Sequence, residues 1–125
     1  MLRQLVSFGA VGLVATLTHV AVAWLASSAA GMHYLLANLL GAIAAFFMSF
    51  LGNARLTFRT RQPIIHSGPR YLVITFVSYV LASAIMAFVE AHDLPGYLYA
   101  AFVLCVVPPT TFMLARLWVF APGNP

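Results

Sequence analysis

Four long stretches of apolar and small residues, separated by short polar segments, dominate the sequence. They cover residues 5–29, 35–54, 71–89 and 97–120. A helix needs roughly 20 predominantly apolar residues to cross a bilayer, so the pattern predicts four transmembrane helices in a single domain, residues 1–125. The separations at 31–34 and 90–96 are short enough to join neighbouring antiparallel helices directly.

The longest separation, Arg55–Arg70, carries several basic residues. Pro63, Gly68 and Pro69 within it disfavour a continuous helix. The sequence therefore predicts a basic loop at the membrane interface between the second and third spans.

Small and polar side chains recur at every third or fourth position of the second span. Because this spacing follows the helical repeat, it places them in one strip where another helix can approach closely. The strip consists of Asn38, Gly41, Ala45, Ser49 and Asn53. Such a strip can serve within one protomer or between two, and we expect a homo-oligomer, most simply a dimer.

The composition agrees with a membrane protein. The chain is 63% hydrophobic and 6% charged, whereas a soluble domain is about one-quarter charged. Its net charge of +4 resides at the span ends, which favours membrane lipid over nucleic acid as a partner. A signal peptide cleaved near Ala29 is the alternative for the first span, although its apolar run exceeds the usual length of about 7 to 15 residues. The single Cys105 excludes an intrachain disulfide, and we expect it to be a small buried hydrophobe.

The charged residues are segregated along this topology. Glu90 and Asp93 fall on one side, and all six arginines fall on the other: Arg3, Arg55, Arg59, Arg61, Arg70 and Arg116. Arginines at span ends mark the cytoplasmic side. Both termini are therefore predicted to be cytoplasmic.

The chain also contains an internal repeat. The segment Phe50–Phe58 aligns without gaps on Phe112–Phe120, and Arg3–Val6 resembles Arg70–Val73. Each half begins and ends on the cytoplasmic side, so the halves would be related by an axis along the membrane normal. The predicted fold is an all-α integral membrane protein with four transmembrane helices as two parallel two-helix repeats.

Candidate chemistry lies in the arginines and in a proline pair. The planar guanidinium fork suits a phosphate, so Arg55, Arg59, Arg61, Arg70 and Arg116 are candidates for binding a phosphate headgroup; the alternative is that they only orient the protein. Pro108 and Pro109 remove backbone donors inside the fourth span. We expect a kink or a short unwound stretch there, which is either a hinge or merely a bend.

His19 is predicted near the middle of the membrane. An ionisable residue at that depth is a functional candidate, and the alternative is a neutral histidine hydrogen-bonded across a helix seam. The other histidines have no metal-ligand spacing with it. The sequence also lacks a nucleophile beside a base and a glycine-rich phosphate loop, so we expect no catalytic residues, no metal, no cofactor and no enzymatic activity.

Three motifs resemble the GtrA family of small four-span membrane proteins over nearly the whole chain. They are Phe8-x-x-Val11-Gly12-x-x-x-Thr16-x-x-His19, Ser49-Phe50-x-x-Asn53-x-x-x-Thr57-Phe58 and Phe112-x-x-x-Arg116-x-Trp118-Val119-Phe120. The resemblance implies a role in cell-surface polysaccharide synthesis, in which a polyprenyl-phosphate-linked sugar is moved across the inner membrane beside a glycosyltransferase.

Two alternatives stand beside this transport function. A scaffold would hold a glycosyltransferase at the bilayer without transport, and a small multidrug exporter would share the four-span layout. The exporter fits poorly because Glu90 and Asp93 lie at the predicted outer boundary rather than inside the membrane. For transport, the lipid tail can stay in the bilayer, so only the headgroup needs a polar path. The residues that could line it are Thr16, His19, Asn38, Ser49, Asn53, Thr110 and Thr111.

The predicted topology can be tested by cysteine labelling. Cysteines introduced at Ser67 and Asp93 should react with an impermeant reagent from opposite faces of the membrane, because the arginines and the acidic residues mark opposite sides. Labelling of both positions from one face would contradict the topology.

Overall fold

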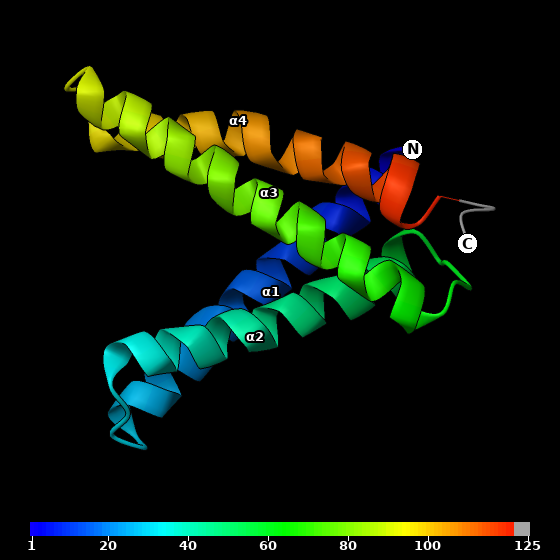
Figure 1. Ribbon diagram of the computed structural model, residues 1–125, viewed down its shortest axis with the longest axis horizontal. Coiled ribbons are helices and arrows are strands. Elements are labelled where there is room, and N and C mark those ends of the chain that lie inside the picture. Colours follow the sequence, from blue (N-terminus) through cyan, green and yellow to red (C-terminus); the bar gives the residue numbers. More distant parts are fainter. Residues whose placement is uncertain (122–125) are drawn as a thin grey trace. The chain divides into compact units, whose positions relative to one another are not determined.

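The computed structural model describes residues 1–121 and contains four long helices (Figure 1). They are α1 (Leu2–Ser28), α2 (Tyr34–Gly52), α3 (Ile64–Ala91) and α4 (Gly96–Leu114). Two short π-helices, η1 (Asn53–Thr57) and η2 (Ala115–Val119), extend α2 and α4. Each of the four resulting segments is long and apolar enough to cross a membrane. The all-α, four-span fold predicted from the hydropathy pattern is thus confirmed.

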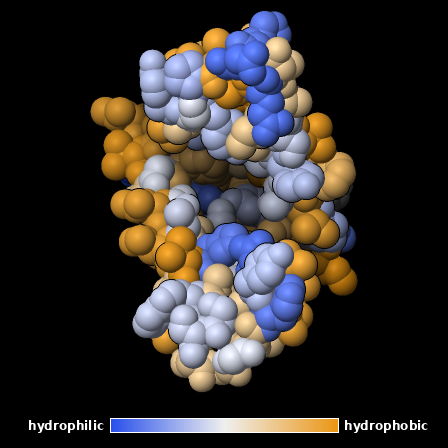
Figure 2. Space-filling model, turned by 90° about the vertical axis from the view of Figure 1, so that its left-hand side faces the viewer, coloured by the Kyte–Doolittle hydropathy of each residue, from blue (hydrophilic) through white to orange (hydrophobic). Residues whose placement is uncertain are grey.

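The chain divides into two compact units, Met1–Thr60 and Arg61–Pro125. In the first unit α1 packs against α2 and η1, and in the second α3 packs against α4 and η2. Each unit is therefore a helical hairpin. Large apolar side chains cover the outside of both, and hydrophilic residues gather at the turn of each hairpin (Figure 2). This distribution suits helices surrounded by lipid.

The start of the third span differs from the prediction. The helix α3 begins at Ile64 rather than Tyr71, so the expected loop Arg55–Arg70 shrinks to the few residues between η1 and α3. Pro63 has the extended conformation of a residue that precedes a helix, with φ −59° and ψ 142°. Pro69 lies inside the helix, where its missing N–H removes one hydrogen bond, to the carbonyl of Ile65, close to the helix start. Proline in this stretch therefore positions the beginning of the helix instead of preventing it.

This earlier start also affects the labelling experiment. Ser67 is only 1% exposed, so a cysteine at that position would react slowly whatever the topology. Its neighbour His66 is exposed, as is Asp93. His66 is the better position for the cytoplasmic label.

The proline pair does not unwind the fourth span. Pro108 and Pro109 lie inside α4, which stays helical from Gly96 to Leu114. Proline has a φ value that fits a helix, and backbone surrounded by lipid has no water to bond with outside a helix. The hydroxyls of Thr110 and Thr111 add further hydrogen bonds in this stretch, to the carbonyls of Val106 (2.7 Å) and Val107 (3.0 Å). The expected unwound stretch is therefore wrong.

The two hairpins have the same local construction. The bounds of α2 and η1 recur in α4 and η2 at positions 62 residues later: 34 and 96, 52 and 114, 53 and 115, 57 and 119. The turns correspond as well, since Gly31 (φ 69°) and Asp93 (φ 50°) both adopt a left-handed conformation. The match of Phe50–Phe58 to Phe112–Phe120 therefore holds in the secondary structure.

The register predicted for the first helix of each repeat is wrong. The helices α1 and α3 end at Ser28 and Ala91, which are 63 residues apart. With this offset Phe8 corresponds to Tyr71, and each ring contacts the aromatic residue that follows its π-helix: Phe8 contacts Phe58, and Tyr71 contacts Phe120. Arg3 consequently corresponds to His66 rather than Arg70. The relation of the two hairpins by an axis along the membrane normal stays a prediction.

The strip of small residues on α2 faces α1 within the hairpin. A Cβ atom added at Gly41 would lie 2.6 Å from the backbone oxygen of His19 and 2.6 Å from its Cδ2 atom. Gly52, one residue before η1, is similarly close to Val11, at 2.8 Å from its Cγ1 atom. Glycine at these two positions allows the helices to approach closely, as the sequence predicted for Gly41.

Replacing Gly41 by alanine should destabilise the first hairpin. The new Cβ would clash with the backbone of α1, so the helices must move apart, at a cost of about 1–3 kcal/mol. Gly9→Ala is the matched control, because a Cβ there meets nothing within 4 Å and alanine favours the helix. Thermal unfolding in detergent should show a lower midpoint for Gly41→Ala only. Equal midpoints for the two variants would contradict the close approach.

Candidate functional site

A chain of hydrogen-bonded polar side chains connects α1 with the end of α2. The Asn53 amide donates to Ser49 Oγ (3.4 Å), and the Thr57 hydroxyl donates to Asn53 Oδ1 (2.9 Å). Ser7 on α1 lies 2.7 Å from the Thr57 hydroxyl. Because the Thr57 proton is used toward Asn53, Ser7 donates and Thr57 Oγ1 accepts. These four residues, Ser7, Ser49, Asn53 and Thr57, are called the polar chain below.

The centre of the polar chain is buried. Asn53 is 1% exposed and Thr57 is 0% exposed. Both belong to η1, and their spacing of four residues lets both side chains reach the same side of the helix, toward α1. An unsatisfied polar group here would cost about 1–3 kcal/mol, and the hydrogen bonds of the polar chain avoid that cost.

Arg3 lies beside the polar chain and binds the end of η1. Its Nη1 atom donates to the Leu56 carbonyl (3.1 Å), and its Nη2 atom donates to the Thr57 carbonyl (2.7 Å). The last carbonyls of a helix lack partners in the helix and carry partial negative charge. Arg3 thus satisfies two of them, while its side chain remains exposed to the surroundings.

Arg55 is bound to the same stretch of backbone. Its Nη1 atom donates to the Thr60 carbonyl at 2.9 Å. Between these residues, Arg59 adopts a left-handed conformation with φ 49°, which is uncommon for a residue with a side chain. The connection therefore turns sharply after η1, and the carbonyls of residues 56–60 hold the guanidinium groups of Arg3 and Arg55.

The predicted arginines are divided between the two units. Arg55 and Arg59 are exposed residues of the first hairpin. The second unit contains Arg61, which is exposed, and Arg70 and Arg116, which are half-buried. Within the first hairpin, the structure brings Arg55 close to the backbone that Arg3 also contacts.

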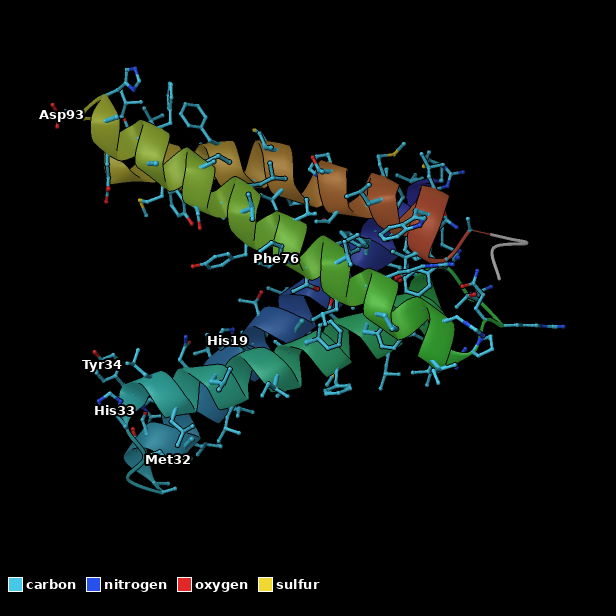
Figure 3. The ribbon with its side chains drawn as sticks, viewed as in Figure 1. His19, Met32, His33, Tyr34, Phe76 and Asp93 are labelled. Carbon is cyan, nitrogen blue, oxygen red and sulfur yellow. The ribbon has the colours of Figure 1, made fainter. Side chains whose placement is uncertain are left out.

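The residues predicted for the polar path fall into separate groups. His19 lies on α1 (Figure 3). Its Nε2 atom lies 2.8 Å from Asn38 Oδ1 and so joins α1 to α2, close to the point where Gly41 approaches the backbone of His19. Since the amide oxygen is an acceptor, His19 donates from Nε2. Ser49 and Asn53 belong to the polar chain. Thr16, Thr110 and Thr111 donate to carbonyls of their own helices: Gly12, Val106 and Val107.

Arg3, Ser7 and Thr57 were missed as site residues by the sequence reasoning. The predicted strip of small and polar residues on α2 includes Asn53 as its last member, although Thr57 follows Asn53 at the same spacing of four residues. Arg3 and Ser7 have the same spacing of four on α1, but nothing in the sequence shows which residues of α2 they face. The signal that the sequence does contain is Thr57, a polar residue that continues the spacing of four near the end of an apolar span.

The second hairpin has apolar residues at two of the four positions of the polar chain, and polar residues, Arg70 and Thr111, at the positions of Ser7 and Ser49. Asn53 and Thr57 of η1 correspond to Ala115 and Val119 of η2, both 0% exposed. The end of this hairpin is capped by a neutral side chain, because Gln62 Nε2 donates to the Ala121 carbonyl at 2.7 Å. The buried polar pair Asn53 and Thr57 is therefore a property of the first hairpin and not a requirement of this type of hairpin.

The residues of 1–121 offer no group of three His, Cys, Asp or Glu side chains that could hold a metal ion. The chemistry available at the polar chain is hydrogen bonding and cationic attraction. Such groups bind an anionic or hydroxyl-rich headgroup.

Comparison with known proteins gives one family. The family model of the GtrA/DPMS transmembrane domain matches residues 7–120. No curated protein and no solved structure matches the chain.

Removing the Thr57 hydroxyl should destabilise the first hairpin. Thr57→Val leaves the buried Asn53 oxygen without its donor, at a cost of about 1–3 kcal/mol. Adding Asn53→Ala should recover part of this cost, because the double variant has the residues that the second hairpin uses at these positions. Thr18→Val is the control, since that hydroxyl bonds only within α1, to the Val14 carbonyl. Unfolding in detergent is measured for the wild type, Thr57→Val, the single variant Asn53→Ala, the double variant and the control, and additive effects of the two substitutions would contradict the coupling.

Proposed function

The chain belongs to the GtrA/DPMS transmembrane-domain family, whose members are membrane proteins of polysaccharide or glycolipid synthesis, and from this premise we propose that it moves a polyprenyl-phosphate-linked sugar across the inner membrane. The observation that carries the proposal is the polar chain beside Arg3 at one end of the first hairpin. Polar groups are costly inside a membrane protein and tend to mark its functional sites.

The physical basis of transport is the different solvation of the two ends of the lipid. The prenyl tail stays in the hydrocarbon throughout, whereas the phosphate and the sugar require polar partners along the way. A small protein can supply these partners along its lipid-facing side and needs no closed channel. The candidate partners are Thr16, His19, Asn38, Ser49, Asn53, Thr110 and Thr111.

In this proposal arginines hold the phosphate before it crosses. Arg55 and Arg116 are the principal candidates, with Arg59, Arg61 and Arg70 contributing positive charge at the headgroup level. Pro108 and Pro109 leave α4 with two backbone donors fewer than a regular helix. That stretch of α4 is the segment we propose to bend during transport.

The protein would act without catalysing a reaction itself. We propose that its partner is a membrane glycosyltransferase, which makes or uses the lipid-linked sugar. Both termini are proposed to be cytoplasmic. The proposed assembly is a homo-oligomer. The exporter alternative gains no support, because Glu90 is an exposed residue in the last turn of α3 and Asp93 lies in the turn after that helix. Proton-coupled export would instead require a carboxylate within the membrane.

The proposal can be tested by reconstitution. Liposomes containing the protein should move a fluorescent polyprenyl-phosphate sugar between leaflets faster than empty liposomes, as measured by the accessibility of the dye to a quencher added outside. If the rates are equal while the protein increases the activity of the partner glycosyltransferase, the chain is a scaffold rather than a transporter.

Arg116→Gln tests the role of the arginines. We expect about tenfold slower movement or more, as for the loss of a charge-assisted hydrogen bond, with normal insertion, because the other arginines still fix the topology. Thr18→Val should move substrate at the wild-type rate. A correctly inserted Arg116→Gln protein that does the same would show that Arg116 only orients the chain.

A further inference from the structure

We propose that Arg3, acting together with Arg55, binds the phosphate of the polyprenyl lipid, and that the polar chain positions Arg3 for this role. The inference rests on the proposed function and assigns its phosphate site to the first hairpin. Four observations support it: the hydrogen bonds of Arg3, the charge of the hairpin, the way its helix ends are joined, and the comparison with the second hairpin.

The guanidinium of Arg3 is fixed but retains donors. Of its five N–H groups, it directs one from Nη1 and one from Nη2 to the carbonyls of Leu56 and Thr57. The remaining N–H groups can donate to another acceptor, and the side chain is exposed. An arginine held in this way loses little conformational freedom when it binds a ligand, which favours affinity.

The positive charge of the hairpin is not cancelled by acidic residues. Residues 1–60 contain no aspartate or glutamate, and both arginines donate to neutral carbonyls of the 56–60 segment. Carbonyls stabilise a guanidinium without neutralising it. Two fixed cations on the 56–60 segment attract an anion, and in the proposed site the oxygens of one phosphate accept from both.

The polar chain fixes the position of Arg3 relative to η1. Ser7 lies one helical turn after Arg3 on α1, and its hydrogen bond to Thr57 joins the two helix ends side chain to side chain. Asn53 holds the Thr57 hydroxyl in turn. The carbonyl of the same Thr57 accepts from Arg3, so a shift of α1 along α2 would break both contacts of Thr57 together.

The second hairpin shows that the fold does not need polar groups at the positions of Asn53 and Thr57. It uses Ala115 and Val119 at the positions of Asn53 and Thr57, fully buried and apolar. Replacing both partners of a buried hydrogen bond by apolar residues of similar shape can be neutral or stabilising. The polar chain of the first hairpin therefore indicates a function, and its position indicates that this function is to hold Arg3.

The test is a lipid-binding measurement that does not depend on transport. The protein in detergent is titrated with polyprenyl phosphate and, separately, with the corresponding polyprenol, and native mass spectrometry gives the two affinities. The ratio of these affinities reports the phosphate contact alone. We expect Arg3→Gln to lower this ratio about tenfold while polyprenol binding is unchanged, and Thr18→Val to leave the ratio at the wild-type value.

Two further variants keep the test decisive. If Arg3→Gln does not fold, Arg3→Lys replaces it; lysine keeps the charge but lacks the fork that reaches two carbonyls and a ligand together, so the ratio should still fall at least about threefold. The double variant Asn53→Ala with Thr57→Val should fold, as the second hairpin does, and should lower the ratio because the side-chain bond of Ser7 to Thr57, which fixes α1 and therefore Arg3 relative to η1, is lost.

The outcomes separate this inference from the proposed function. An unchanged ratio in the Arg3 variants would overturn the assignment of Arg3, even if the wild-type protein binds and moves the lipid. A wild-type protein that binds polyprenyl phosphate and polyprenol equally would overturn the phosphate site altogether. Inorganic phosphate is added as a competitor in a final arm, and displacement of the lipid by an equal concentration of it would assign the site to free phosphate and overturn the lipid assignment.

Discussion

A polar group inside a bilayer must find its hydrogen-bond partner within the protein, because no water is present to supply one. This constraint explains why α4 stays helical through Pro108 and Pro109. It also explains why the threonine hydroxyls of the spans bond to carbonyls of their own helices, as Thr16 does to Gly12. The polar chain obeys the same constraint in another way, because its members bond to each other across two helices.

The two hairpins show how much of this construction the fold itself requires. They share helix bounds, a left-handed residue in the turn and a π-helix before the final aromatic residue. A π-helix adds a residue to the turn, and such turns are often found at functional sites. Here the same π-helix is lined with Asn53 and Thr57 in one hairpin and with Ala115 and Val119 in the other. The backbone is therefore a common scaffold, and the side chains placed on it differ with the role of each hairpin.

Much of the fold could be predicted from the sequence, because hydropathy over about 20 residues is a strong signal of a membrane span. The close approach at Gly41 was also predictable, since only small residues in a strip allow it. The start of α3 was not predictable, because proline disfavours the interior of a helix but is tolerated before or near its start, as at Pro63 and Pro69. The effect of a proline depends on its position in the helix, and that position was not known beforehand.

Of the candidate site, only the residues on the second span could be predicted from the sequence, and not those on α1. Ser49 and Asn53 share a strip that periodicity within one helix can detect. The role of Arg3 and Ser7 depends on the residues of η1 that they contact. Which residues of two helices lie opposite each other is set by side-chain packing, such as that of Val11 against Gly52. The internal repeat could have indicated which residues lie opposite each other, but the predicted correspondence of Arg3 to Arg70 was wrong. The aromatic contacts of Phe8 and Tyr71 correct it.

The groups that hold the Arg3 guanidinium determine whether its positive charge remains available to bind an anion. A carboxylate partner would have held the guanidinium firmly and also cancelled its charge, and an ion pair has little remaining attraction for a phosphate. The end of a helix supplies about half a negative charge, spread over several carbonyls. It fixes the guanidinium geometrically and leaves most of its positive charge in place. A small membrane protein with two acidic residues in its whole sequence can thus orient an arginine with backbone carbonyls and neutral polar side chains, and keep its charge for an anionic headgroup.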